Sequence, residues 1–172
     1  VNDTLLPLNV VLEAKSFTVD EQGEIAYRPL DKHIHLKLAR MSFRIPPQQS
    51  YWVFYEATAD QLPAWFVIYA NFTGYPFKSA SGMNVQLELP HTVYLLPKGD
   101  RKQPDVSLVT AEYRPAAHKI VVEVSNQSLL FGRALAAEIS GGRQKTTQNG
   151  FPLFPNSHRR VEIAWEGEEP PQ

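Results

Sequence analysis

The sequence contains no cysteine. A thiolate metal site, a cysteine nucleophile and a disulfide framework are therefore excluded. Neither sign of charge dominates, because 17 lysine and arginine residues stand against 18 aspartate and glutamate residues. A protein without a basic field has no general electrostatic attraction for nucleic acid or anionic lipid. We therefore expect no nucleic-acid partner.

Long apolar runs are also missing. The longest, residues 64–70, is too short to cross a bilayer, so we expect no direct membrane insertion. No basic segment followed by an apolar one opens the chain, which begins with Val1. We expect a mature or trimmed product whose targeting segment, if it had one, is gone. No sustained helical period with caps occurs anywhere in the sequence.

What is present is a series of strand-sized segments in a chain of 172 residues with 43% apolar content, enough for real cores. Residues 98–104 are polar, charged and broken by glycine and proline, which is typical of a linker. We predict an all-β protein with two immunoglobulin-like β-sandwich domains in tandem. The first covers residues 1–98, a linker covers 99–104 and the second domain covers 105–172.

In the first half, residues 33–38 alternate between apolar and polar side chains, as in a half-buried strand. Residues 51–55 are densely aromatic and β-branched, and residues 64–72 read as a strand buried on both faces. We predict that these last two strands form the centre of the first core. In the second half, we predict strands at residues 107–113, 120–124, 134–139 and 161–165, and a turn at Asn149-Gly150.

A weak internal repeat supports two copies of one architecture. Residues 1–6 resemble residues 124–130, since each has an apolar strand end, an asparagine turn at Asn2 or Asn126, and then another strand. About 20 residues of strand precede the turn in the second copy, whereas only Val1 precedes it in the first. If the copies are equivalent, the opening strands of the first domain are missing, and strand exchange between two copies becomes possible.

Few side chains suggest catalysis. His33 and His35 lie about 6–7 Å apart on one face of a strand, a spacing that some metal sites use, but no third ligand is visible nearby. The glycines near Ser81 and Ser140 are turn glycines, without the flanking pattern of a serine nucleophile. We predict no enzymatic activity, no metal and no cofactor, and keep a metal-dependent enzyme using the two histidines as a distant alternative.

The most informative stretch is residues 82–97. Four apolar residues alternate with polar ones before Pro90, which breaks the ladder and predicts an edge strand: Met83, Val85, Leu87 and Leu89. An edge strand with large apolar residues needs a cover. The side chains either fill the core of their own domain or enter that of a client that pairs with the strand. Substituting Leu87 by Asp separates the two, because a core residue would unfold the protein and an exposed one would abolish client capture.

The order of these features resembles the PapD-like family, the periplasmic chaperones of the chaperone–usher pilus pathway. The resemblance spans nearly the whole chain. Its motifs are the turn at Asn2, the hairpin at residues 19–23, Phe43-Arg44-Ile45-Pro46-Pro47, the strand at residues 65–72, the segment Val93-Tyr94-Leu95-Leu96-Pro97, the segment 120–126, and Pro152-Leu153-Phe154-Pro155.

This resemblance implies a periplasmic, non-enzymatic chaperone that binds pilus or fimbrial subunits by donor-strand complementation and delivers them to an outer-membrane usher. Met83, Val85, Leu87 and Leu89 then form the donor strand. The family anchors the subunit's terminal carboxylate with basic residues. Thr92 stands at the family's lysine position, and Lys98 is the alternative anchor. The competing interpretation is an immunoglobulin-like adhesion or structural module without chaperone activity.

Overall fold

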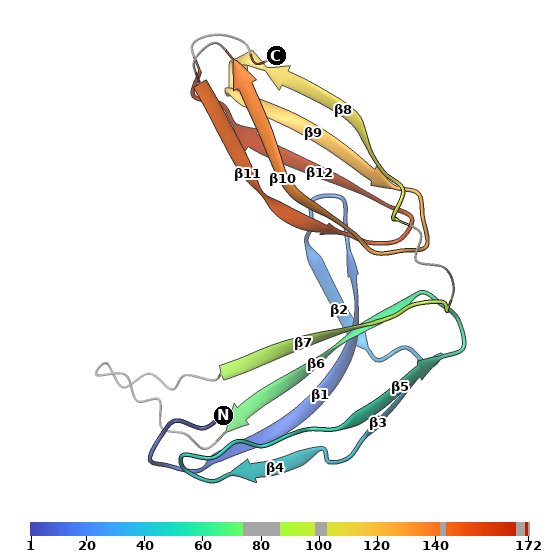
Figure 1. The fold of residues 1–172 in the computed structure, drawn as a ribbon, viewed down its shortest axis with the longest axis vertical. Helices are drawn as coiled ribbons and strands as arrows, with labels where there is room; N and C mark the ends of the chain where they lie inside the picture. Colours follow the sequence, from blue (N-terminus) through green and yellow to red (C-terminus); the bar gives the residue numbers. More distant parts are fainter. Residues whose placement is uncertain (74–86, 99–102, 142–143, 168–170, 172) are drawn as a thin grey trace. The chain divides into compact units, whose positions relative to one another are not determined.

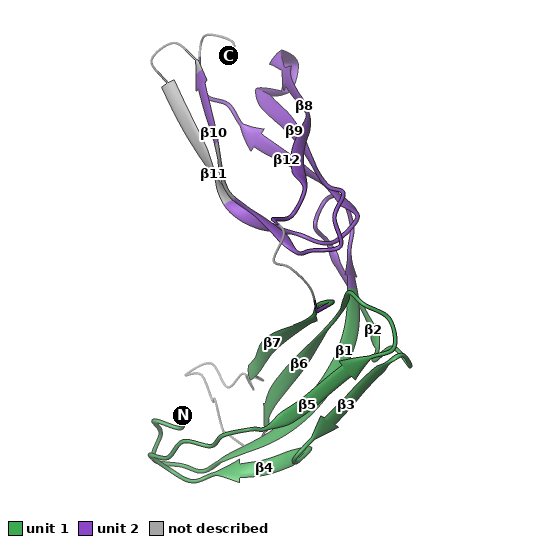
Figure 2. Ribbon diagram, turned by 45° about the vertical axis from the view of Figure 1, so that its right-hand side comes forward, with its two compact units in different colours: residues 1–17, 27–97 green, residues 18–26, 98–172 purple. Residues whose placement is uncertain are grey.

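The computed structural model describes residues 1–73, 87–98, 103–141, 144–167 and 171. The fold is all-β, as predicted, and within the described residues the one helical element is the 3₁₀ turn Pro115–Ala117. The chain forms two compact units, one of Val1–Phe17 with Tyr27–Pro97 and one of Thr18–Ala26 with Lys98–Gln172 (Figure 2). The predicted linker falls largely outside the described residues, so the domain boundary stays a prediction.

Unit 1 is built around a five-stranded sheet. The strands of this sheet are β1 (Leu8–Val19), β2 (Ile25–Pro29), β4 (Ser42–Ile45), β6 (Ala64–Thr73) and β7 (Leu87–Leu95), and the end of β1 and the start of β2 belong to the segment Thr18–Ala26 that is grouped with unit 2. They follow the order β2-β1-β6-β7, and β4 pairs with β1 (Figure 1). Strands β4, β6 and β7 pair with their neighbours in antiparallel fashion.

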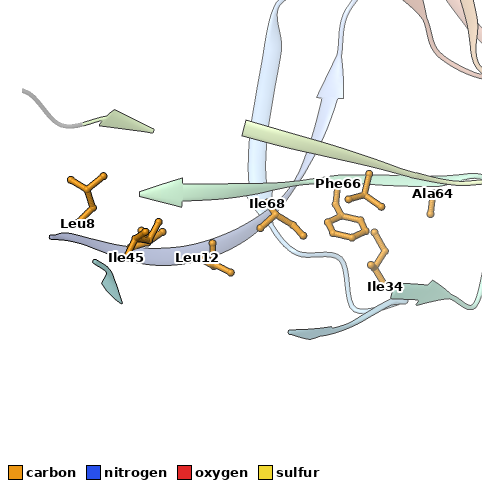
Figure 3. Packing of buried hydrophobic residues seen from close by; sticks show 9 residues of the cluster. Leu8, Leu12, Ile34, Ile45, Ala64, Phe66 and Ile68 are labelled. Carbon is orange, nitrogen blue, oxygen red and sulfur yellow. The ribbon is translucent and has the colours of Figure 1, made fainter. Parts of the chain in front are cut away.

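A second sheet of unit 1 consists of β3 (Ile34–Leu38) and β5 (Tyr55–Ala59), paired antiparallel. Its inward residues meet those of β1 and β6 in one apolar core, in which Ile34 lies close to the fully buried Phe66 (Figure 3). The predicted alternation in β3 is confirmed, because Ile34 is buried while His35 and Lys37 are exposed. This packing of two sheets over one core is the sandwich arrangement that the sequence predicts.

The prediction of a strand at residues 51–55 is wrong for all but Tyr55. Residues 51–54 are not in a strand, and the side chains of Trp52 and Phe54 are 80% and 73% exposed, so they are not part of the core. The alternation itself is present, since Tyr51 and Val53 pack against the core. What the segment lacks, within the part of the chain that the structure describes, is a neighbouring strand to complete a ladder.

Unit 2 also has two sheets. One contains β8 (Val106–Arg114), β9 (Lys119–Asn126) and β12 (Ser157–Ala164), with β9 in the middle. The other is the antiparallel pair β10 (Gly132–Gly141) and β11 (Gln144–Leu153). The core packs Ile120, Val122, Ile163 and Trp165 against Ile139 of β10. The predicted turn at Asn149-Gly150 is wrong, because β11 runs through both residues and pairs Asn149 with Ala136.

The internal repeat is visible in detail at the buried side chain of Asn2. Its Nδ2 donates hydrogen bonds to the carbonyl oxygens of Leu6 at 2.8 Å, Ile45 at 3.2 Å and Pro46 at 3.0 Å. Its Oδ1 accepts hydrogen bonds from the amide and hydroxyl of Thr4, at 3.1 and 2.7 Å. One amide side chain therefore ties the turn that follows it to the end of β4.

Asn126 has the same set of partners in unit 2. Its Nδ2 donates to the carbonyl oxygens of Leu130 at 2.7 Å, Leu153 at 3.3 Å and Phe154 at 3.1 Å. Its Oδ1 accepts from the amide and hydroxyl of Ser128, at 3.1 and 2.7 Å. We call these two networks the asparagine clasps. The predicted equivalence of the two turns is thus confirmed bond by bond.

The equivalence extends into the strands on either side. In unit 1, β1 starts opposite the end of β4, with Leu8 paired to Ile45. In unit 2, β10 starts opposite the end of β11, with Gly132 paired to Leu153. Three residues after each of these strand ends, Gln48 and Asn156 both have a positive φ, 55° and 50°. The two units therefore share register and turn geometry around the clasp.

Candidate strand-pairing site

Strand β7 lies at the end of the strand order in the large sheet of unit 1. It pairs with β6 from Leu87, opposite Phe72, to Leu95, opposite Ala64. Among the described residues no strand pairs with its other side, so the predicted edge position is confirmed. Pro90 lies opposite Tyr69. Proline is tolerated in an edge strand because the missing amide hydrogen can fall on the unpaired side.

The register with β6 fixes which side chains of β7 face the core. Directly opposed residues point to the same face of a sheet, and Val93 opposes the buried Phe66. Leu87 and Leu89 are an even number of residues away from Val93 in the strand, so they also point to the inner face. They lie opposite Phe72 and Ala70. Val93 is buried, yet Leu87 and Leu89 are 39% and 50% exposed. The inner face is thus covered near Val93 and open near the start of β7.

Two of the four predicted donor residues, Met83 and Val85, lie outside the described residues. The structure places Leu87 and Leu89 together, on one strand and on one face. The predicted alternation therefore holds for the part of the stretch that is described. The assignment of all four side chains to a client stays a prediction.

The two candidate anchors are not brought together. Thr92 lies in β7 opposite Val67. It is an odd number of residues away from Leu87 and Leu89, so it points to the outer face and they point to the inner face. Lys98 is exposed and follows the end of β7 by three residues. A threonine hydroxyl donates one neutral hydrogen bond, whereas a lysine ammonium supplies a charge. The chemistry of a carboxylate anchor therefore favours Lys98 over Thr92.

His91, which the sequence left as an isolated histidine, contacts the second sheet. Its Nε2 lies 3.0 Å from the hydroxyl oxygen of Tyr55, and the two rings meet edge to face with centroids 5.8 Å apart. His91 shares the inner face with Leu89 and Val93. This contact closes the gap between β7 and β5 beside the open part of the core. No local sequence signal predicts it, because 36 residues separate the partners.

On the outer face, Tyr69 of β6 is the most perturbed titratable group of the site. Burial, followed by a hydrogen bond with Tyr27, raises the pKa of Tyr69 to about 12. The rings of Tyr69 and Tyr27 pack edge to face at 5.8 Å, and Lys15 lies 5.7 Å from the centroid of the Tyr69 ring. Burial also raises the pKa of the Tyr94 hydroxyl. Burial is the largest cause of both shifts.

The metal alternative based on His33 and His35 gains no third ligand from the structure. Nε2 of His35 lies 2.8 Å from Oδ1 of Asp60, and both side chains are exposed. In residues 1–73, 87–98, 103–141 and 144–167, no group of three or more His, Cys, Asp or Glu side chains is placed to hold a metal ion. Across those same ranges, no helix has the length and apolar character needed to span a bilayer.

The comparisons with known proteins found similarity in structure and none in sequence. No family model and no curated protein matches the sequence. A search of the solved structures found a similarity to the crystal structure of the class 5 fimbriae chaperone CfaA, at a TM-score of 0.48 and 13% sequence identity. The match covers 99% of this chain and 87% of that chain.

Proposed function

We propose that this protein is a periplasmic chaperone that binds a pilus or fimbrial subunit by donating the strand of which β7 is the described part. The observation that carries the proposal is the orientation and exposure of the side chains of Leu87 and Leu89. Both point to the core side of an edge strand and remain 39% and 50% exposed. Apolar side chains on an unpaired ladder are the two components of recognition by strand addition.

The energy of such an interaction comes mainly from the side chains. Burying a large aliphatic side chain fully is worth about 1.5–3 kcal/mol. Leu87 and Leu89 are partly exposed, so each can bury further surface against a client. Met83 and Val85 would increase the buried area if they continue the same face. The unpaired amides and carbonyls of β7 would fix the register, because a slip of one residue turns every apolar side chain away from the client.

In the same proposal, Lys98 binds the terminal carboxylate of the subunit, with Thr92 as the weaker candidate. Delivery to an outer-membrane usher and a periplasmic location belong to the proposal as well, and both rest on the sequence resemblance. The protein needs no cofactor, since the work consists of exchanging one strand partner for another.

The test compares Leu87→Asp with Val11→Asp. Val11 is a good control because it is 44% exposed, lies in β1 of the same sheet and points to its outer face. Each tagged variant is purified from periplasmic extract, and co-purifying proteins are identified by mass spectrometry. We expect a fimbrial subunit to accompany the unaltered protein and Val11→Asp but not Leu87→Asp. A loss of about 3 kcal/mol, from one lost aliphatic contact and one unpaired carboxylate, weakens binding by about 150-fold.

Circular dichroism must show that Leu87→Asp is still folded, since the argument requires an exposed residue. An unfolded Leu87→Asp protein would identify Leu87 as core and contradict strand donation. Equal capture of a subunit by Leu87→Asp and Val11→Asp would also contradict strand donation. A folded protein without any subunit would favour an immunoglobulin-like adhesion or structural module.

A further inference from the structure

The inner face of β7 changes from exposed to buried at His91. Leu87 and Leu89, which precede it, are 39% and 50% exposed, whereas Val93, which follows it, is 8% exposed. All four side chains point to the same face, because even numbers of residues separate them in the strand. A boundary between two parts of this face therefore lies at His91.

Tyr55 of β5 contacts His91 at this boundary. By alternation, Tyr55 lies on the same side of β5 as Ala57 and Ala59, which pack against the core. Of these three side chains that of tyrosine is the long one, and its hydroxyl oxygen lies 3.0 Å from Nε2 of His91. The two rings also meet edge to face, with centroids 5.8 Å apart. The Tyr55–His91 pair thus joins the two sheets of unit 1 by a polar contact and a ring contact.

The backbone of β7 changes at the same place. Pro90, directly before His91, has no amide hydrogen. Proline is tolerated in an edge strand where the missing hydrogen falls on the unpaired side, and a strand that pairs with this side then lacks one donor at Pro90. The ladder that β7 offers to a client is therefore weakened next to the residue at which its apolar side chains become buried.

We propose that the Tyr55–His91 pair ends the apolar contact between β7 and its client, an inference that rests on the proposed function. The client receives the side chains of Leu87 and Leu89 and does not receive that of Val93. Tyr55 and His91 are positioning residues, because they hold β7 against β5 beyond Leu89 and keep Val93 in the core of unit 1.

The pair also determines the chemistry of the client beside it. One hydrogen bond leaves the phenol oxygen of Tyr55 and the imidazole ring of His91 with capacity for further hydrogen bonds, and both side chains are exposed. An apolar client surface at this position would remove water from these polar atoms without replacing its hydrogen bonds, which costs free energy. The client is therefore apolar where it contacts Leu87 and Leu89, and it has a hydrogen-bonding side chain beside the pair.

The first measurement uses the absence of cysteine in the chain. Leu89→Cys and Val93→Cys are introduced separately, and the rate of alkylation by a maleimide is measured in the folded protein. We expect Val93→Cys to react about tenfold more slowly than Leu89→Cys, because it reacts only after local opening. Tyr55→Phe should raise the rate at Val93→Cys by about fivefold, the effect of one lost hydrogen bond, and leave the rate at Leu89→Cys unchanged.

Tyr27→Phe is the matched control, since the hydroxyl of Tyr27 also forms a hydrogen bond, with Tyr69 on the outer face of the same sheet. This control should change neither rate. His91→Gln keeps a hydrogen-bonding group for Tyr55 and should leave the rate at Val93→Cys unchanged, whereas His91→Leu should raise it. Equal rates at the two cysteines, or a rate at Val93→Cys that does not respond to Tyr55→Phe, would overturn the proposal.

The second measurement needs no cysteine. The probe is the subunit that co-purifies with the unaltered protein, and its dissociation from Leu89→Ala is compared with its dissociation from Val93→Ala, after circular dichroism has shown both variants to be folded. We expect Leu89→Ala to speed dissociation by about tenfold and Val93→Ala by less than about twofold. Equal acceleration would place Val93 in the client contact and overturn this inference alone. The absence of any co-purifying subunit would overturn the proposed function and this inference with it.

Discussion

The asparagine clasp of unit 2 is expected to be one of the most sensitive points of the fold. Asn126 is buried, donates to three carbonyl oxygens and accepts two hydrogen bonds from Ser128. Substitution by alanine removes all five contacts and leaves buried carbonyls without this donor. A typical hydrogen bond contributes about 0.5–1.5 kcal/mol, and a buried group left without a partner costs about 1–3 kcal/mol. Since bonds in one network are not additive, we expect Asn126→Ala to cost about 3 kcal/mol.

Hydrogen exchange measures this effect in each unit separately. A cost of 3 kcal/mol raises the population of open states by about 150-fold, at 1.4 kcal/mol for each factor of ten. The increase should be found in peptides that cover β9 and β12, which meet at Asn126 and Ser157. Peptides from β6 in unit 1 serve as the internal reference.

Ser128→Ala is the matched control, because it keeps the amide side chain and removes one hydroxyl that bonds to Asn126 at 2.7 Å. We expect it to cost about 1 kcal/mol. Asn2→Ala should produce the corresponding effect in unit 1. An increase of less than about fivefold in β9 and β12 for Asn126→Ala, corresponding to about 1 kcal/mol, would refute the reasoning.

Three further predictions concern the rest of unit 1. Phe66 is fully buried at the centre of the core, so Phe66→Ala should cost about 3–5 kcal/mol in urea unfolding, and a cost under 1 kcal/mol would mean that the core is not packed as described. The pKa of Tyr69 is raised to about 12, so its contribution to stability is present below the ordinary tyrosine pKa and is lost as the pH rises through the folded value. Ultraviolet titration should detect tyrosines that ionise late, and Tyr69→Phe should remove one of them while leaving that of Tyr94. The side-chain hydrogen bond from Arg28 lowers the pKa of Asp31, so this pair contributes stability above the ordinary carboxyl pKa and loses it as the pH falls through the folded value. Asp31→Asn should lower stability by about 1 kcal/mol at neutral pH and flatten the acid limb of the stability curve; an unchanged acid limb would count against the pair.

Much of the fold follows from local pattern. Strand β3 could be predicted because its apolar residues recur at every second position, and β6 because residues 64–70 are all apolar. The proline within β7 predicted an edge strand correctly, since a missing amide hydrogen restricts where a strand can lie. The repeat of the asparagine turns could be predicted because each copy has an apolar strand end, an asparagine turn and then another strand.

Residues 51–54 show where local pattern fails. Their composition favours a strand, but a ladder also requires a neighbour, and pairing is a property of segments distant in the sequence. Asn149-Gly150 is a comparable case. The pair favours a tight turn, yet pairing with β10 holds both residues in β11. Intrinsic preference is outweighed by the lack of a described partner strand at residues 51–54 and by pairing with β10 at Asn149.

Some features of the candidate site could be predicted from local sequence pattern, and others could not. The alternation that placed Leu87 and Leu89 on one face is local and was predicted correctly. The contact between His91 and Tyr55 depends on two sheets meeting, which no spacing in the sequence encodes. The role of Thr92 or Lys98 as a carboxylate anchor stays a prediction, because the sequence does not show the geometry of a partner.

The duplicated clasp also has a consequence for engineering. In each unit the asparagine Nδ2 donates to the carbonyl oxygen four residues later, at 2.8 Å for Asn2 and 2.7 Å for Asn126. We therefore expect the loops of residues 3–6 and 127–130 to be exchangeable between the two units, so that a chain with one loop transplanted keeps the strands on either side of it.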